Sequence, residues 1–185
     1  DKDQIEDIIN LGIYSLINFI EIKIGMSLNE KSKESIRKHY IRMILFDYII
    51  GRKCRGLDYY IISKINEQGK PIWSDAYLSP ISVSNGIEKD ELIGNNEYLL
   101  NNKLIDREEL LKVLFERFYY ELKKTTESLN EASRLYIDAI NRIIYNNTSL
   151  EKSIQLEDEI EKNLSRINKE QKAKEKVLEK DQRIN

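Results

Sequence analysis

The sequence predicts a mainly α fold, of the α+β class, with one small β-hairpin and a long charged C-terminal helix. Only 2 prolines and 7 glycines interrupt the 185 residues, and these are the residue types that most often end helices. Apolar residues recur at three- and four-residue spacing along most of the chain, as they do on the buried face of a helix. One stretch near residues 58–79 is instead rich in β-branched and aromatic residues, which indicates a hairpin.

The overall composition is that of an ordinary globular protein: 41% of residues are hydrophobic, 34% are charged and the mean hydropathy is -0.55. Lys and Arg number 30 against 32 Asp and Glu, so the formal net charge is -2. Nucleic acid is therefore not an expected partner, because a protein that coats it needs a large basic excess. A run of about 18 uncharged apolar residues, which a membrane span requires, does not occur. The default expectation is a cytoplasmic location.

Metal and disulfide chemistry have little support in the sequence. The single Cys54 excludes an internal disulfide, and with the single His39 it leaves no cluster for a structural zinc ion. His39 has no evident orienting partner, so we interpret it as a surface or core-edge residue rather than a catalyst. We predict no metal and no cofactor.

The first two helices are delimited by local signals. Eight apolar residues at helical spacing predict a helix over residues 3–24, ended by Gly25. Ser27 and Glu30 have the spacing of a capping box before a second helix, which Gly51 ends. Near its C-terminal end this second helix is apolar almost all round, so we expect it to be buried at the centre of its domain.

The chain between the second helix and the later helices is predicted to contain the hairpin. Residues 59–65 and 71–78 are its strands, and its loop lies near Asn66-Glu67-Gln68-Gly69. A loop that contains Pro80 and Gly86 follows.

Three further capping signals predict the remaining helices: Asp106 with Glu109, Ser128 with Glu131, and Thr148 with Glu151. The first of these helices is expected to run through Leu110 and Phe118 to Leu122.

The last helix is predicted over about residues 149–182. Its only sustained apolar line is Leu156, Ile160, Leu164 and Ile167, and residues 151–185 hold nine acids and nine bases. Such a composition favours a solvated helix with i,i+4 ion pairs. A coiled-coil dimer is the alternative, although four apolar positions fall short of the several heptads that it requires. The domain organisation is therefore a helical lobe over 1–148 and a charged helical extension over 149–185.

Residues 41–62 join the end of the apolar second helix to a loop and to the hairpin. The helix end has the pattern F-D-x-x-I-G, formed by Phe46, Asp47, Ile50 and Gly51, and residues 78–86 form a second loop after the hairpin. This order resembles the catalytic segment of HipA-like serine/threonine kinases, in which such a helix leads to a catalytic loop, a hairpin and a metal-binding loop. The resemblance covers about residues 1–145. It implies that they form a helical kinase-like C-terminal lobe.

The chemistry of that family is missing at the matching positions. Its catalytic Asp falls on Cys54, its metal-binding Asn on Tyr59, and the Asp of its second loop on Val83. Phosphoryl transfer depends on Mg²⁺, which prefers hard oxygen ligands, and on a carboxylate that orients the attacking hydroxyl. The resemblance therefore implies a degenerate lobe with no catalytic residues and no kinase activity.

The degenerate catalytic loop supplies the candidate binding residues: Arg52, Lys53, Cys54, Arg55, Asp58 and Tyr59. Its three cations could bind a phosphate, a nucleotide or an acidic partner surface. Equally, they could be a solvated loop after a helix C-terminus, where the helix dipole favours cations. Asp58 lies four residues beyond the catalytic position, and Cys54 lacks the partners of a thiol nucleophile.

Three functions remain open at this stage. The first is a non-catalytic, kinase-like interaction or regulatory protein with an unidentified protein partner. The second is a phosphate- or nucleotide-binding protein with residual or altered transferase activity. The third is a helical protein–protein interaction module unrelated to kinases, whose extension over 149–185 docks onto another chain.

Overall fold

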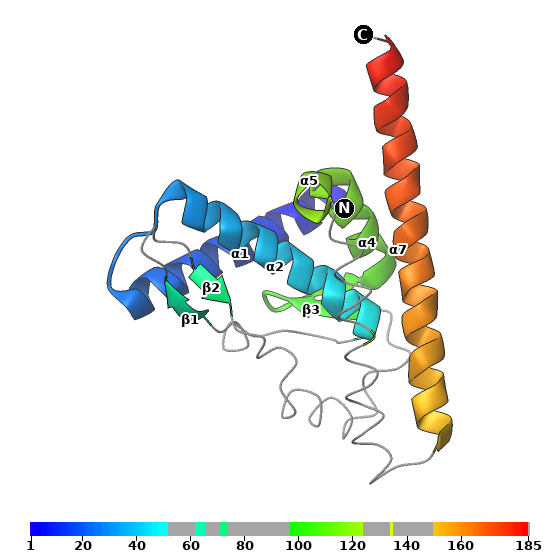
Figure 1. Ribbon diagram of the computed structural model, residues 1–185, viewed down its shortest axis with the longest axis horizontal. Coiled ribbons are helices and arrows are strands. Elements are labelled where there is room, and N and C mark those ends of the chain that lie inside the picture. Colours follow the sequence, from blue (N-terminus) through cyan, green and yellow to red (C-terminus); the bar gives the residue numbers. More distant parts are fainter. Residues whose placement is uncertain (52–61, 66–70, 74–96, 124–133, 135–149, 185) are drawn as a thin grey trace.

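The computed structural model describes residues 1–51, 62–65, 71–73, 97–123, 134 and 150–184, with the backbone alone for 62–65, 71–73 and 150–156. Over these residues the protein is mainly helical, with two small two-stranded antiparallel sheets, as Figure 1 shows. The predicted fold class is therefore confirmed. In the described part of the chain, no helix has both the length and the apolar character needed to cross a bilayer.

Two long helices form the first layer: α1 (Lys2–Ile24) and α2 (Glu30–Ile50). Gly25 and Gly51 end them as predicted, with φ of 71° and 73° in the left-handed region that favours glycine. The predicted cap of the second helix is wrong by two residues. Asn29, not Ser27, is the N-cap, because its side chain accepts a hydrogen bond from the Ser32 backbone N–H at 2.9 Å.

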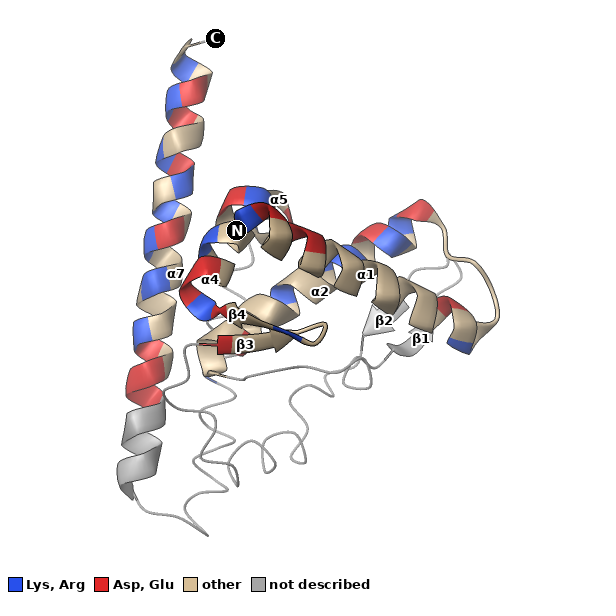
Figure 2. Cartoon of the chain, turned by 180° about the vertical axis from the view of Figure 1, so that it is seen from behind, with Lys and Arg blue, Asp and Glu red and all other residues tan. Residues whose placement is uncertain are grey.

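Helix α2 lies at the centre of the core, as its all-round apolar pattern predicted. From Met43 to Ile50 every side chain is buried, and Ile41 and Ile49 have no exposed surface. The reason is that α1 covers one side of α2, while α4 (Arg107–Arg117), α5 (Tyr119–Leu122) and α7 (Leu150–Ile184) contact others. Figure 2 shows α2 almost free of charged residues along this stretch.

The predicted hairpin near residues 58–79 is present as β1 (Ile62–Ile65) and β2 (Pro71–Trp73), which pair antiparallel. Its predicted loop, 66–69, lies outside the described residues. A second hairpin, β3 (Glu97–Leu100) with β4 (Lys103–Asp106), was not predicted. Its two-residue turn is Asn101-Asn102, with φ of 48° and 60°. Both turn residues therefore have the positive φ of a type I′ hairpin, which asparagine tolerates.

The helix predicted over 110–122 is divided in two. Asp106 caps α4 as expected, accepting hydrogen bonds from the backbone N–H groups of Glu108 and Glu109. The chain then breaks at Phe118, whose φ of -123° is not helical, and continues as the short α5. Phe118 is fully buried, so burial of its ring accompanies the break. The predicted caps at Ser128 and Thr148 lie outside the described residues.

Helix α7 has 35 residues, or about 52 Å at the helical rise. It packs against α2 and α4, and its C-terminal turns extend past the helical body (Figure 1). Along the predicted apolar line, Ile160 and Ile167 are buried and Leu164 is partly buried. The predicted domain boundary at 148/149 stays a prediction, although α7 contributes these side chains to the same core.

Gly12 marks a close approach between α1 and α2. A Cβ placed at Gly12 would lie 2.6 Å from the ring carbon Cζ of the buried Tyr40. Because a real Cβ never approaches so closely, we expect Gly12→Ala to displace the Tyr40 ring and to lower the free energy of unfolding by about 1 kcal/mol. That figure allows for the gain of about 1 kcal/mol that alanine brings to a helix interior. Urea unfolding measures the change.

The exposed Leu11 on the same helix is the matched control. Leu11→Ala should change the free energy of unfolding by less than about 0.5 kcal/mol. Gly12→Ala should cost less in a Tyr40→Phe background than in the parent chain, because the atom nearest the added Cβ is the Tyr40 hydroxyl oxygen. A Gly12→Ala variant more stable than the parent would contradict the close contact.

Candidate functional site

The six residues of the predicted binding loop, Arg52, Lys53, Cys54, Arg55, Asp58 and Tyr59, lie outside the described residues. So does Val83 in the second loop. The structure does describe the helix end from which the binding loop starts, at Gly51. The candidate site is therefore built from the residues that hold this end of α2.

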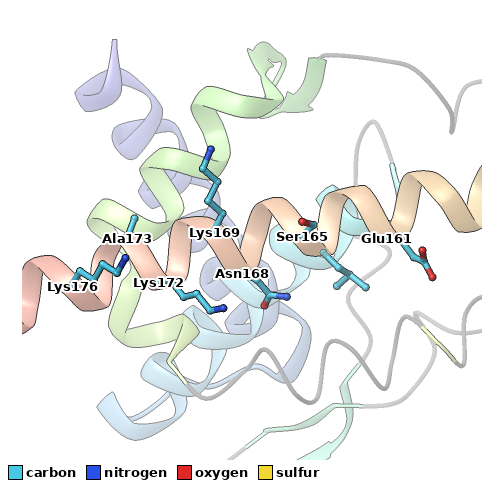
Figure 3. Close-up of a pocket in the computed structure, with 8 residues that line it drawn as sticks. Glu161, Ser165, Asn168, Lys169, Lys172, Ala173 and Lys176 are labelled. Carbon is cyan, nitrogen blue, oxygen red and sulfur yellow. The ribbon is translucent and has the colours of Figure 1, made fainter.

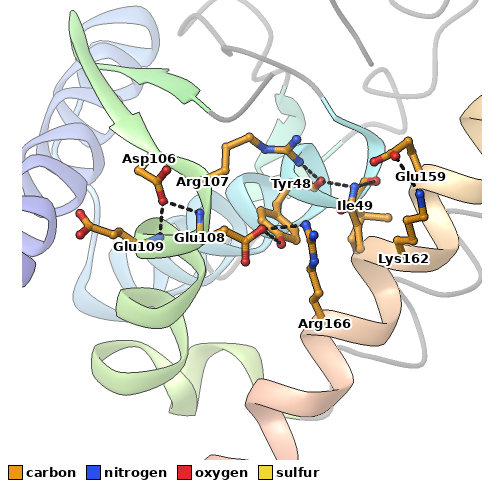
Figure 4. A network of polar contacts seen from close by, with 10 residues as sticks. Tyr48, Ile49, Asp106, Arg107, Glu108, Glu109, Glu159, Lys162 and Arg166 are labelled. Atoms are coloured by element: carbon orange, nitrogen blue, oxygen red, sulfur yellow. Dashed lines mark hydrogen bonds and ion pairs between the residues drawn. The ribbon is translucent and has the colours of Figure 1, made fainter. Parts of the chain in front are cut away.

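Side chains from α4 and α7 bind the last carbonyl groups of α2 (Figure 4). The Asn163 Nδ2 group donates to the carbonyl oxygens of Tyr48 and Ile49, at 3.1 and 3.0 Å. The Arg107 guanidinium also donates to the Tyr48 carbonyl. The final carbonyls of a helix lack intrahelical donors and are costly to bury unpaired. This clamp, formed by Asn163 and Arg107, binds the carbonyls of Tyr48 and Ile49 with side chains from distant parts of the chain.

A second set of contacts surrounds the Tyr48 side chain. Its hydroxyl donates to Glu108 Oε1 at 3.0 Å, and Arg166 Nη1 lies 2.7 Å from the same oxygen. The Arg107 guanidinium carbon lies 4.7 Å from the centre of the Tyr48 ring, in a cation–π contact. Tyr48, Glu108 and Arg166 thus join α2, α4 and α7 at one point, as Figure 4 shows.

Burial shifts the pKa values of Tyr48 and Arg107 in opposite directions, and both shifts favour the neutral form of the side chain. Burial, with a smaller contribution from Glu108, raises the pKa of Tyr48 to about 12, although Arg166 opposes the change. Desolvation lowers the pKa of Arg107, and the nearby Tyr48 and Glu108 partly offset this. Tyr48 therefore stays a neutral hydrogen-bond donor at physiological pH. The site holds its geometry through fixed hydrogen bonds rather than through groups poised to exchange protons.

The electrostatic field at this end of α2 is shaped by the helix dipole. The C-terminal end of a helix carries a partial negative charge, which cations stabilise. Arg107 and Arg166 supply two cations there, and Glu108 balances one of them. Chemically, this arrangement fixes the C-terminal end of α2 up to Gly51.

Asp47, part of the F-D-x-x-I-G pattern, is completely buried. The Tyr98 hydroxyl donates to its Oδ2 at 2.7 Å, which ties β3 to α2. Tyr40 is also buried nearby. Its pKa is raised well above the ordinary value, first by burial and then by the charge of Asp47. In the described structure Asp47 therefore anchors the second hairpin to the core.

A hollow of about 760 Å³ lies along α7, beside the residues drawn in Figure 3. Its described lining comes from one face of this helix: Glu161, Leu164, Ser165, Asn168, Lys169, Lys172, Ala173 and Lys176. Sequence reasoning missed this site. The signal was available in the three- and four-residue spacing of the lysines, which places them on one helix face.

Within the described residues, no three His, Cys, Asp or Glu side chains come together in a way that could hold a metal ion. No protein family, curated protein or solved structure matches the chain. The contacts, burial and charges given above are therefore the basis for a function.

Proposed function

We propose that this chain is a non-catalytic interaction or regulatory protein, whose helical body presents the outer surface of α7 to a protein partner. By outer surface we mean the exposed residues of α7 from Glu161 to Ile184. The observation that carries the proposal is the docking of this 35-residue helix along one narrow stripe. Ile160, Asn163 and Ile167 are buried there, while Val177 and Ile184 are 51% and 81% exposed.

The contacts of the stripe favour a fixed position for α7. A buried polar residue in an apolar helix interface penalises other registers, because its hydrogen bonds are lost when the helix slides. Asn163 has this role here, since its two acceptors are backbone carbonyls at the end of α2. The outer surface of α7 is thereby presented to a partner in one orientation.

The charge pattern of α7 suits a helix that faces water on its other sides. Acidic and basic residues alternate along it, as Figure 2 shows. Local pairs such as Lys162 with Glu159, at 3.3 Å, support the helix without contact to the body. A solvated helix fixed by one stripe is well placed to add a partner on its exposed side.

The kinase-like origin of the body is part of the proposal. It is supported by the order of elements: α2 buries Phe46 and Asp47, ends at Gly51, and is followed along the chain by the hairpin of β1 and β2. This is the order that the HipA-like resemblance implies. The replacement of the catalytic and metal-binding residues by Cys54, Tyr59 and Val83 is what supports the absence of catalysis in this proposal.

Two measurements test this function. A photo-cross-linking amino acid at Val177 or at Ile184, introduced in cells of the source organism, should give a discrete adduct with one protein. The same amino acid at Leu104, which is 66% exposed on β4, should give none. An adduct pattern that is the same at all three positions would contradict the proposal.

The second measurement addresses catalysis. Purified protein incubated with radiolabelled ATP and Mg²⁺ should transfer no phosphate to itself or to the cross-linked partner. Phosphate transfer at a rate abolished by Asp58→Ala would overturn the non-catalytic assignment. It would favour the alternative of a residual or altered transferase.

A further inference from the structure

We infer that the hollow on α7 is a docking site for an acidic amphipathic helix of a partner protein. This inference rests on the proposed function and names the chemistry of its partner. The lining holds three lysines, Lys169, Lys172 and Lys176, against the single acid Glu161. A volume of about 760 Å³ is large enough to take up several side chains of a partner.

The three lysines differ in their contacts from three other basic residues of the same helix, Lys162, Arg166 and Lys174. Arg166 pairs with Glu108 at 2.7 Å, Lys162 pairs with Glu159, and Lys174 donates to the Glu116 carbonyl at 3.3 Å. Across the described residues, Lys169, Lys172 and Lys176 make no ion pair or hydrogen bond. Their positive charge is therefore available to a partner.

The spacing of these lysines fits a helix. Lys172 and Lys176 are one turn apart, about 6 Å, and Lys169 and Lys176 are two turns apart, about 10 Å. Glutamates three, four or seven residues apart on a second helix have the same separations, so several carboxylates can face the lysines at once. Glu161, about 12 Å before Lys169 along the axis, would face a basic residue of the same partner.

The rest of the lining suits an amphipathic segment rather than a free anion or a nucleic acid. Leu164, Ala173 and the apolar stems of the lysines can pack against apolar side chains. None of the eight described lining residues is aromatic, so base stacking has no platform there. Glu161 repels phosphate groups.

A second copy of α7 is a poorer occupant of this hollow. Its own lining would bring six lysines against two glutamates, which leaves an excess of like charge at the interface. An acidic helix removes that excess.

The experiment uses the full chain and a fluorescent amphipathic helical peptide of about 20 residues, with glutamates at four-residue spacing on its polar face. The variant is Lys169→Gln, Lys172→Gln, Lys176→Gln. The matched control is Lys103→Gln, Lys112→Gln, Lys123→Gln, which removes the same charge from exposed positions on other parts of the body. Circular dichroism checks that both variants keep the helical content of the parent chain.

We expect the parent chain and the control to bind the peptide within about twofold of each other, and the α7 variant to bind it at least about tenfold more weakly. Added salt should weaken binding to the parent chain more than to the α7 variant. The inference is overturned if the parent chain does not bind the peptide at about millimolar concentration. It is also overturned if the α7 variant and the control lose the same affinity, or if a peptide with glutamine in place of glutamate binds the parent chain equally well. Displacement of the peptide by inorganic phosphate or RNA, or a dimer that only the α7 variant loses, would also overturn it.

Failure of this inference is distinguishable from failure of the proposed function. If the peptide does not bind but Val177 and Ile184 still give their discrete adduct in cells, α7 remains an interaction helix with a partner of different chemistry.

Discussion

Replacement of Ile167 by aspartate should release α7 from the helical body. Ile167 is 1% exposed and packs in the core beside α2 and α4. An unpaired carboxylate is too costly to bury there, so the variant helix should undock instead. The expected loss is then the free energy of docking. It amounts to about 3–5 kcal/mol, since burial of a large aliphatic side chain contributes about 1.5–3 kcal/mol and α7 buries Ile160 as well.

Amide hydrogen exchange measures this release residue by residue. Amides from Ile160 to Lys174 should lose protection in Ile167→Asp, while those of α1 should keep it. The control is Ile184→Asp on the same helix, where the side chain is 81% exposed. This substitution should change the free energy of unfolding by less than about 0.5 kcal/mol. Unchanged protection of α7 in Ile167→Asp would show that the buried stripe does not hold the helix.

The bounds of α1 and α2 could be predicted because the signals for them are local. Each helix has a sustained three- and four-residue apolar period and a glycine at its end, Gly25 or Gly51. A left-handed C-cap depends on the residue that occupies it and little on the rest of the fold. The N-cap of α2 was harder to predict, because Ser27 and Asn29 both precede the helix and both are residue types that cap helices.

The second hairpin escaped prediction because its strands contain a single β-branched residue, Ile105. Its turn has no glycine, and Asn101-Asn102 is a weaker signal than Asn-Gly. The alternation of Glu97, Tyr98, Leu99 and Leu100 is also incomplete. The sequence around Phe118 gives no local signal for the break. Helix propensity describes the local preference of a residue and does not reveal how the rest of the fold buries its ring.

The clamp at the end of α2 could not be predicted from spacing. It joins Tyr48 to Arg107 and Asn163, which are 59 and 115 residues away along the chain. One partial signal existed. Asn163 lies beside Leu164 on the apolar line of α7, where a polar side chain indicates a buried hydrogen-bond partner. The binding loop over 52–59, by contrast, was predicted from a family resemblance and stays a prediction.

Removal of the Tyr98 hydroxyl should weaken the attachment of β3 and β4 to the core. In Tyr98→Phe the ring still fills its buried position, but Asp47 Oδ2 loses the donor that lies 2.7 Å away. Removal of one partner of a buried hydrogen bond costs about 1–3 kcal/mol, so we expect a decrease of about 2 kcal/mol in the free energy of unfolding. Urea unfolding monitored by circular dichroism measures it.

The matched control is Tyr120→Phe, because Tyr120 is a tyrosine with 74% of its surface exposed. Its hydroxyl can exchange a protein contact for water, so the free energy of unfolding should change by less than about 0.5 kcal/mol. Hydrogen exchange locates the effect: in Tyr98→Phe the amides of Leu100 and Ile105 should lose protection before those of α1 do. Equal losses in the two variants would mean that Asp47 finds another donor when Tyr98 is gone. The anchoring of the second hairpin would then depend on the packing of Leu100 and Ile105, which are both buried, rather than on this hydrogen bond.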